Sequence, residues 1–283
     1  MKQILIVGSN SSISRQLVDN LVENYKIDMA YSSENCGITL THANFQKINL
    51  KNAIVSEKKY DFVIIISAFI PENNKHNIQK LFEVNVELIE RITLKFSNSK
   101  IIFCSSVSVY TPKGEIIKES TSPNPINEYG LSKLWGEQII KRNCKSYILF
   151  RISSIVGITM KSNTFIPKII DVALTDSIIT LFGNGERLQN YINVRDLCIM
   201  IEKSFMYQKN EVFLAVGESS FSNKQIAEIV QKYIPANILY EGVDNSFSNV
   251  YDSSYTKKCL NFNYSLTIEN SIEEIIEWKR KKF

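Results

Sequence analysis

Short runs of branched apolar residues alternate with amphipathic segments over the first half of this chain. The runs lack the polar–apolar alternation of a half-exposed strand, so they indicate strands buried on both faces, which is typical of a parallel sheet. Strands are expected at residues 4–7, 27–31, 45–48, 62–67, 101–105 and 147–151, and helices at residues 12–23, 51–58, 78–96 and 128–143. This strict order predicts an α/β fold with a Rossmann-type doubly wound parallel sheet.

The pattern changes after Gly157, where helices are expected at residues 165–174, 222–234 and 268–282 around shorter strands. Two apolar segments, residues 194–205 and 212–216, could return to the main sheet. We therefore predict a Rossmann domain in residues 1–160, to which residues 190–217 return, and a smaller interleaved C-terminal lobe from residues 161–189 and 218–283. Because ligands of open α/β sheets bind at the carboxyl ends of the strands, this lobe is expected to close over a substrate there.

Composition and charge indicate which kinds of ligand or binding partner are not expected for this chain. The net charge is +4 and the lysines are dispersed, so a nucleic-acid partner is not expected. The five cysteines form no CxxC pair and there are two histidines, so neither a disulfide framework nor a metal site is expected. The longest apolar stretch, residues 62–70, is far shorter than the about 20 residues that span a bilayer, and the N-terminus lacks the features of a signal peptide. We expect a cytoplasmic protein without a membrane partner.

The first expected strand ends in a turn that contains Gly8, Ser11 and Ser14. A dinucleotide-binding fold needs a tight turn here, then a helix whose N-terminus faces a pyrophosphate. Gly8 suits the tight turn, whereas the serines stand where further glycines are usual. Serine is small enough to let a phosphate approach, and its hydroxyl can donate to it. A plain strand–helix turn whose serines cap the helix explains these residues equally well.

The second expected strand ends at Ser32 and Ser33, without the carboxylate that binds the ribose hydroxyls of NAD. A carboxylate would repel the 2′-phosphate of NADP, and Arg15, just past the first turn, could supply positive charge. NADP(H) is therefore slightly favoured as a cofactor. Glu34, one residue from a suitable position, keeps NAD(H) open.

Tyr129 and Lys133 lie one helical turn apart, on one face of the expected helix at 128–143. A free phenol has a pKa of about 10, and a neighbouring ammonium favours its ionised form, so the tyrosine can exchange a proton with a substrate oxygen near neutral pH. Ser106 follows an expected strand at the ligand-binding edge of the sheet, where it could bond the same oxygen. The spacing alone is weak evidence, because a chain with 13 tyrosines contains about one such pair by chance.

These residues belong to an ordered set of motifs along the chain. The set comprises Asn85 with Val86, residues 105–110, Glu119 with Pro125, residues 129–133 with Glu137, Arg151 through Gly157, residues 165–167, residues 183–185, and residues 189–194 with Asp196. In this order the set resembles the extended short-chain dehydrogenase/reductase family, and more narrowly its sugar-nucleotide epimerases, dehydratases and reductases. The resemblance covers essentially the whole chain, and it implies an NAD(P)-binding Rossmann domain.

The resemblance also implies roles for individual residues. Ser106 is implied to polarise the substrate oxygen, Tyr129 to act as acid and base, and Lys133 to lower the pKa of Tyr129 and bind the nicotinamide ribose. Further cofactor contacts are implied for Gly8, Ser11, Ser12, Ile13, Ser32, Ser33, Asn49, Leu50, Ser67, Ala68, Phe69, Asn85 and Ile152. Substrate contacts are implied for Val107, Ser108, Ser154, Phe165, Ile166, Arg187, Gln189 and Asp252.

The chain departs from the family pattern at several positions. Ser11 and Ser14 replace glycines, Ser154 replaces an asparagine common in the epimerases, and Gln189 replaces an arginine, so that Arg187 is expected to contact a substrate diphosphate instead. For Asp252, a helix cap explains the residue as well as a substrate contact does. These departures bear on the sugar and the nucleotide more than on the fold.

The residues after Ser106 distinguish the possible reactions. Dehydratases of the family carry an Asp-Glu pair there, whereas Val107 and Ser108 can neither donate nor remove the protons that water loss requires. The favoured interpretation is an NAD(P)H-dependent reductase of a nucleotide-linked 4-keto-(deoxy)sugar, in deoxysugar and polysaccharide biosynthesis. The alternative is an NAD-dependent C4 epimerase, and a non-catalytic dinucleotide-binding sensor is less favoured. The resemblance further implies a possible homodimer through the helices at 78–96 and 128–143.

Overall fold

A computed structural model describes residues 1–32, 36–71, 77–111, 114–158, 160 and 162–281. Its centre is a seven-stranded sheet in which every pairing is parallel, in the spatial order β10-β6-β5-β4-β1-β2-β3. The strands are β1 (Gln3–Val7), β2 (Lys26–Tyr31), β3 (Phe45–Asn49), β4 (Phe62–Ile65), β5 (Lys100–Ser106), β6 (Ser146–Ile152) and β10 (Glu211–Ala215). The predicted Rossmann-type parallel sheet is confirmed.

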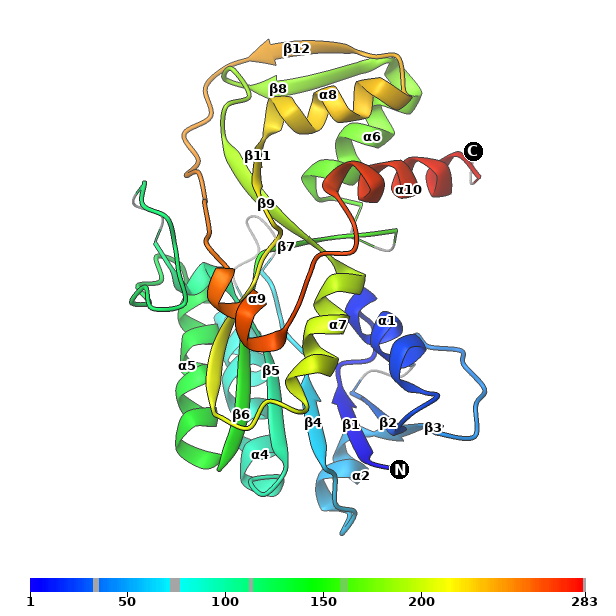
Figure 1. Ribbon diagram of the computed structural model, residues 1–283, viewed down its shortest axis with the longest axis vertical. Helices are drawn as coiled ribbons and strands as arrows, with labels where there is room; N and C mark the ends of the chain where they lie inside the picture. The colour runs from blue at the N-terminus through cyan, green and yellow to red at the C-terminus, as the bar shows by residue number, and fades with distance from the viewer. Residues whose placement is uncertain (33–35, 72–76, 112–113, 159, 161, 282–283) are drawn as a thin grey trace.

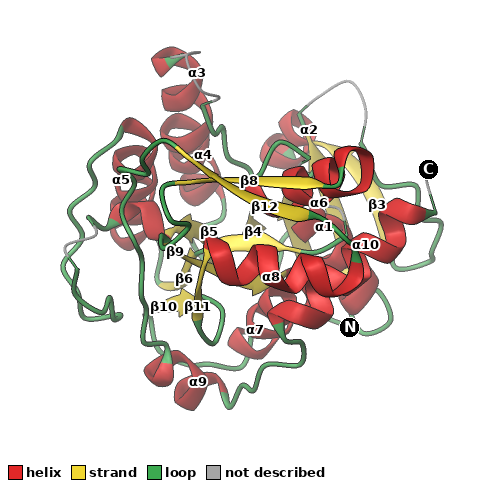
Figure 2. Ribbon diagram, turned by 90° about the horizontal axis from the view of Figure 1, so that it is seen from above, coloured by secondary structure: helices red, strands yellow, loops and turns green. Residues whose placement is uncertain are grey.

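Both faces of the sheet are covered by helices (Figures 1 and 2). Ile4 and Ile6 of β1 pack in one apolar core with helices α1 (Ser12–Leu21) and α7 (Val194–Ser204). The alternate residues Leu5 and Val7 pack in a second core with α2 (Leu50–Val55), α4 (Leu88–Lys95) and α5 (Glu128–Asn143). Because successive side chains of a strand point to opposite faces, unbroken apolar runs are what this double burial requires.

The helical segment before β5 is continuous but not uniform. It begins as α3 (Ile78–Phe82), passes through a π-helical turn at Glu83–Glu87 and continues as α4. The wider turn contains Asn85, which is buried. The sequence predicted one helix over this stretch and contained no signal for the π turn.

The C-terminal segments form a smaller lobe beyond the carboxyl ends of the sheet strands (Figure 1). It contains α6 (Phe165–Asp176), α8 (Asn223–Tyr233) and α10 (Ile268–Arg280) around their own apolar core. Two small sheets complete it, β12 (Asn237–Glu241) with β8 (Ile178–Phe182), and β11 (Ser220–Ser222) with β9 (Leu188–Asn193) and β7 (Ser154–Val156). Helix α9 (Ser254–Leu260) lies against β10 of the main sheet.

Of the two segments that could return to the main sheet, residues 211–215 form its edge strand β10, parallel to β6. Residues 194–204 form helix α7 on a face of the sheet, against α1, and do not pair as a strand. Asn193 caps this helix by accepting a hydrogen bond from the N–H of Arg195. Its buried residues Leu197, Met200 and Ile201 are spaced three and four positions apart, as on one face of a helix. The branched residues in the same run also suit a strand, so the sequence did not indicate a helix clearly.

One buried ion pair joins α5 to the centre of the sheet. The Glu137 side chain, 0% exposed, accepts hydrogen bonds from Nε and Nη2 of Arg151 on β6, at 3.0 and 2.7 Å. It also accepts one from Ser105 Oγ at 2.6 Å, and Arg151 Nη1 donates to the Tyr110 hydroxyl at 2.7 Å. Each charge is thus matched by a partner and by further hydrogen bonds, which burial demands.

We expect Arg151→Met to destabilise the protein by about 3–5 kcal/mol, because the buried Glu137 carboxylate loses the cation that donates two hydrogen bonds to it. Urea unfolding at pH 7 measures the difference. Arg142→Met is the matched control, since it breaks an exposed pair with Glu90 on the surface of α5 and α4, where the expected loss is at most about 1 kcal/mol. Equal losses in the two variants would contradict this account of the buried pair.

Candidate active site

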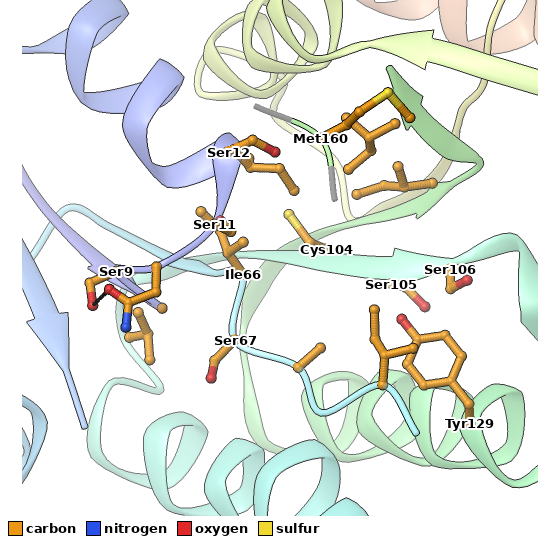
Figure 3. Close-up of a pocket in the computed structure, with 18 of the residues that line it drawn as sticks. Ser9, Ser11, Ser12, Ile66, Ser67, Cys104, Ser105, Ser106, Tyr129 and Met160 are labelled. Atoms are coloured by element: carbon orange, nitrogen blue, oxygen red, sulfur yellow. Dashed lines mark hydrogen bonds between the residues drawn. The ribbon is translucent and has the colours of Figure 1, made fainter. Parts of the chain in front are cut away.

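A cavity of about 670 Å³ opens at the carboxyl edge of the sheet (Figure 3). Its walls come from the ends of β1, β2, β4, β5 and β6 and from the N-termini of α1 and α5. Serines are the most frequent lining residues, and no described lining residue carries a formal charge. Open α/β sheets bind their ligands at this edge, so the cavity is the candidate active site.

The turn after β1 forms one wall of the cavity. Gly8 has a φ of +114°, and a Cβ there would lie 2.7 Å from the backbone N of Ser67, so only glycine fits. Ser11 caps α1 by accepting a hydrogen bond from the N–H of Ser14 at 3.1 Å, and Ser14 donates to the carbonyl oxygen of Gly8. The two interpretations of this turn are therefore compatible, because the serines cap the helix in a turn that also lines the cavity.

Ser106 and Tyr129 meet at the opposite end of the cavity from this turn (Figure 3). Ser106 ends β5, where its hydroxyl donates to Ser108 Oγ and accepts from the N–H of Ser108, both at 3.1 Å. Tyr129 lies in the first turn of α5. Burial raises the pKa of its phenol to about 12, and hydrogen bonding with Ser106 acts in the opposite direction. The phenol therefore keeps its proton at neutral pH.

Lys133 lies one turn further along α5, behind the cavity wall. Its ammonium donates to the carbonyl oxygen of Cys104 at 2.6 Å and lies 4.1 Å from the centre of the Phe103 ring. The side chain is 1% exposed, and burial lowers its pKa to about 8. Burial, rather than this ammonium, dominates the pKa of Tyr129. The implied roles of Lys133 on the tyrosine and on a ribose remain predictions.

The structure places the implied cofactor residues in two groups. Gly8, Ser11, Ser12, Ile13, Ser32, Leu50, Ser67, Ala68 and Ile152 line the cavity with Tyr129. Asn49 instead caps α2 by accepting from the N–H of Lys51 at 2.9 Å. Phe69 and Asn85 are not among the described residues that line the cavity, and Ser33 is outside the described residues.

The side chain of Asn85 connects the loop after β4 to helix α5 by hydrogen bonds. Its amide accepts from the N–H of Phe69 at 2.8 Å and donates to the carbonyl oxygen of Phe69 at 2.9 Å. It also donates to Ser132 Oγ at 3.0 Å, which joins the loop after β4 to the helix residue next to Lys133. The π-helical turn that carries Asn85 thus helps to position helix α5 at the cavity, consistent with the frequent occurrence of such turns at functional sites.

Of the implied substrate residues, Val107, Ser108 and Ser154 line the cavity. Phe165 and Ile166 start α6 and pack in the core of the lobe. In the lobe, Gln189 donates to Asn223 Oδ1 at 2.6 Å, and Arg187 donates to the carbonyl oxygen of Phe247 at 3.4 Å.

Asp252 lies next to helix α9 rather than at the cavity. It accepts a hydrogen bond from the N–H of Ser254 at 3.0 Å, at the start of the helix, and forms an ion pair with Lys118 at 3.5 Å. The structure therefore shows the helix-end interaction that was one of the two interpretations of this residue.

Several residues that line the cavity were not predicted from the sequence. Ser9, Asn10, Ala30, Ile70, Ser153 and Ile155 flank predicted residues at strand ends, so the position of those ends would have identified them. Asn10 accepts from the N–H of Gly37 at 2.8 Å, which ties the first turn to the loop after β2. Met160 and Thr164 precede α6 in a stretch with no motif, and only the folded chain brings them to the cavity.

The described residues show neither of two other kinds of feature, a metal site and a membrane-spanning helix. Within the residues that the structure describes, no group of three His, Cys, Asp or Glu side chains is arranged to hold a metal ion. The same residues include no helix with the length and apolar character needed to cross a membrane.

The fold and the cavity place the chain among dinucleotide-binding Rossmann proteins. The chain belongs to the NAD-dependent epimerase/dehydratase family, whose family model matches residues 4–212. It is 22% identical to the GDP-6-deoxy-D-talose 4-dehydrogenase of Aggregatibacter actinomycetemcomitans, over 97% of this chain and 96% of the relative. It is 24% identical to the UDP-glucose 4-epimerase of Lactobacillus helveticus, over 84% of this chain and 83% of the relative.

Solved structures share the whole fold at low identity. The UDP-N-acetylglucosamine 4-epimerase of Methanobrevibacter ruminantium M1, in complex with UDP-N-acetylmuramic acid, superposes with a TM-score of 0.87 at 19% identity, over 100% of this chain and 99% of the other. MoeE5 in complex with UDP-glucuronic acid and NAD superposes with a TM-score of 0.85 at 17% identity, over 99% of this chain and 100% of the other.

We expect the stability of the wild type relative to Lys133→Met to rise as the pH is raised from 7.5 to 10. The pKa of Lys133 is about 8 in the folded protein and about 10.4 in an unfolded chain, so the unfolded state binds more protons within that window. Urea unfolding of both proteins across this pH range measures the effect. A difference that stays constant with pH would show that burial does not lower the lysine pKa.

Proposed function

We propose that the protein is an NAD(P)H-dependent reductase that acts on a nucleotide-linked 4-keto-(deoxy)sugar. The observation that carries this proposal is the Ser106–Tyr129 pair at the end of the cavity, followed by Val107 and Ser108. The protonated phenol of Tyr129 can donate to a carbonyl oxygen, whereas oxidation of a hydroxyl would first require its ionised form. The similarity to a 4-dehydrogenase of a GDP-linked deoxysugar supports a redox reaction at this carbon.

In this mechanism a reduced nicotinamide dinucleotide, held at the turn that contains Gly8 and Ser11, would supply the hydride that the keto carbon receives. The Ser106 hydroxyl, which donates to Ser108 Oγ in the structure, rotates to donate its proton in a hydrogen bond to the carbonyl oxygen and polarises it. Tyr129 transfers its proton to that oxygen as the carbonyl double bond opens, and the phenolate then regains a proton from solvent. Lys133, one turn away, stabilises the phenolate that forms. Val107 and Ser108 cannot remove a proton from the neighbouring sugar carbon, so the reaction stops at the alcohol.

The second candidate is an NAD-dependent nucleotide-sugar C4 epimerase, which the similarity to a UDP-glucose 4-epimerase supports. The same serine, tyrosine and lysine serve an epimerase that takes a hydride and returns it to the opposite face. A dinucleotide-binding sensor without activity is less favoured, because it has no need of an aligned Ser106 and Tyr129. In all three cases the neighbouring lobe would hold the part of the ligand that extends beyond the sheet.

We propose separately that the protein prefers NADP(H) to NAD(H). Ser32 lines the cavity at the end of β2 and presents no carboxylate to a 2′-phosphate. The Arg15 guanidinium reaches the carbonyl oxygen of Gly37, in the loop that follows β2, at 3.5 Å. It is therefore close enough to that loop to contribute positive charge where an adenosine ribose would lie.

We expect purified protein to oxidise reduced nicotinamide in the presence of a nucleotide-linked 4-keto-6-deoxy sugar. Tyr129→Phe should lower the rate by about 10²–10⁴-fold, because the proton donor is lost, and should leave cofactor binding intact. Absorbance of the reduced cofactor follows the reaction, with NADPH and NADH compared. Tyr240→Phe, an exposed position on β12, is the control. Retention of full activity by Tyr129→Phe would exclude this assignment, and interconversion of hydroxy-sugars without net oxidation would favour the epimerase.

We also propose that a second copy of the chain covers the outer face of α3 and α5. Four apolar side chains are exposed there, namely Ile78, Phe82, Leu131 and Trp135. The rings of Phe82 and Trp135 contact each other edge to face, with centroids 5.6 Å apart, although they are 43% and 51% exposed. Exposed apolar side chains that cluster on one face are typical of an interaction surface, and a pair of helices on each copy fits a two-fold contact.

We expect Trp135→Glu to convert a dimer into a monomer, because it places a charge at the centre of this apolar face. Sedimentation velocity measures the change. Val55→Glu, at an exposed apolar residue of α2, should leave the association unchanged. A wild-type protein that sediments as a monomer at all concentrations would refute the dimer.

A further inference from the structure

Two serines close the turn that faces the cavity at the N-terminus of α1. Ser14 is completely buried, and its hydroxyl donates to the carbonyl oxygen of Gly8. The hydroxyls of Ser11 and Ser14 lie 2.7 Å apart. The N–H of Ser14 donates to Ser11 Oγ at 3.1 Å. Ser11 itself lines the cavity (Figure 3).

Each serine hydroxyl has a single proton, and this determines which hydroxyl donates in each hydrogen bond. A carbonyl oxygen only accepts, so the single hydroxyl proton of Ser14 is used on Gly8. The bond between the two hydroxyls must then be donated by Ser11, which uses the single hydroxyl proton of Ser11. Neither serine retains a proton for a third group, and Ser11 has only a lone pair left to present to the cavity.

A lone pair in this position disfavours an anion. The first turn of a helix offers N–H groups and positive potential to a phosphate. Here Ser11 Oγ already accepts from one of those groups, the N–H of Ser14, which is the third residue of the helix. A pyrophosphate that uses the N–H of Ser14 must therefore displace the Ser11 hydroxyl. One that binds the N–H groups of Ser12 and Ile13 lies against the lone pair of Ser11 unless that hydroxyl gives up its bond to Ser14 Oγ. Among the residues that the structure describes, the lining of the cavity contains no cation to offset either cost.

We propose that the Ser11 hydroxyl competes with the cofactor pyrophosphate for the N-terminus of α1, so that the dinucleotide is held weakly and exchanges after each turnover. This inference rests on the proposed function in one respect, that the cavity binds a nicotinamide dinucleotide. It explains why serine at this position suits a reductase, which must release the oxidised cofactor, rather than an enzyme that retains it.

The test is direct binding of NADH and NADPH, followed by nicotinamide fluorescence without any sugar. Ser11→Ala and Ser11→Gly should each bind about tenfold more tightly than the wild type, the effect of one hydrogen bond to a charged group. Ser222→Ala is the matched control. It removes an N-cap hydroxyl that accepts from the N–H of Gln225 at 3.1 Å at the start of α8, and Ser222 is not among the described residues that line the cavity, so it should change the affinity by less than about twofold.

Unchanged or weaker binding by Ser11→Ala overturns the proposal, because it would show that the hydroxyl does not compete. Tighter binding by Ser11→Gly alone also overturns it, because the cause would then be the Cβ atom. If these variants do not fold, Ser11→Cys decides, since a thiol is a weaker acceptor than a hydroxyl and the variant should also bind NADH more tightly than the wild type; unchanged or weaker binding overturns the proposal. Absence of binding by every protein would overturn the cofactor assignment as well, whereas a functional reductase with unaltered Ser11→Ala affinity would overturn this inference alone.

Discussion

Parallel pairing of every strand in the main sheet is the constraint on which the rest of this structure depends. Parallel neighbours need crossover connections, and the crossovers place helices on both faces of the sheet. Polar side chains are therefore excluded from the faces and gather where the strands end. The carboxyl edge receives the first residues of α1 and α5, and Gly8 permits the close approach of the first turn to Ser67. The cavity is a consequence of this geometry.

The buried Glu137–Arg151 pair is the main exception to an apolar interior. Its carboxylate also holds the hydroxyl of Ser105, the neighbour of Ser106. Asn85 acts similarly on the other side, where it links the loop after β4 to Ser132. The cavity wall is thus held by hydrogen bonds that lie behind it. Such support fixes the orientation of the groups that face the ligand and leaves those groups free to bind it.

The sequence predicted the features that depend on local pattern. Short runs rich in apolar residues identified six strands of the sheet, and the spacing of Tyr129 and Lys133 placed both on one helix. The sequence did not distinguish a helix from a strand at Val194–Ser204, because branched residues suit both. The helix is stabilised by its packing against α1, a tertiary contact that local sequence does not encode. The π-helical turn at Asn85 has no local signal. Met160 and Thr164 lie at the cavity because of the conformation of the loop before α6. The side chain of Gln189 donates a hydrogen bond to Asn223. No sequence motif indicates either of these arrangements.

The charge-free lining of the cavity has a kinetic consequence. Clefts lined by one sign of charge accelerate the arrival of oppositely charged ligands, and salt removes that acceleration. This cavity offers an anionic dinucleotide hydroxyls, N–H groups and apolar walls, and the excess of positive charge on the chain is small and dispersed. As far as the described lining residues are concerned, encounter is therefore governed by diffusion and by the fit of hydrogen-bonding groups. The dependence of the association rate on ionic strength should then be small and should come mainly from Arg15, next to the loop after β2.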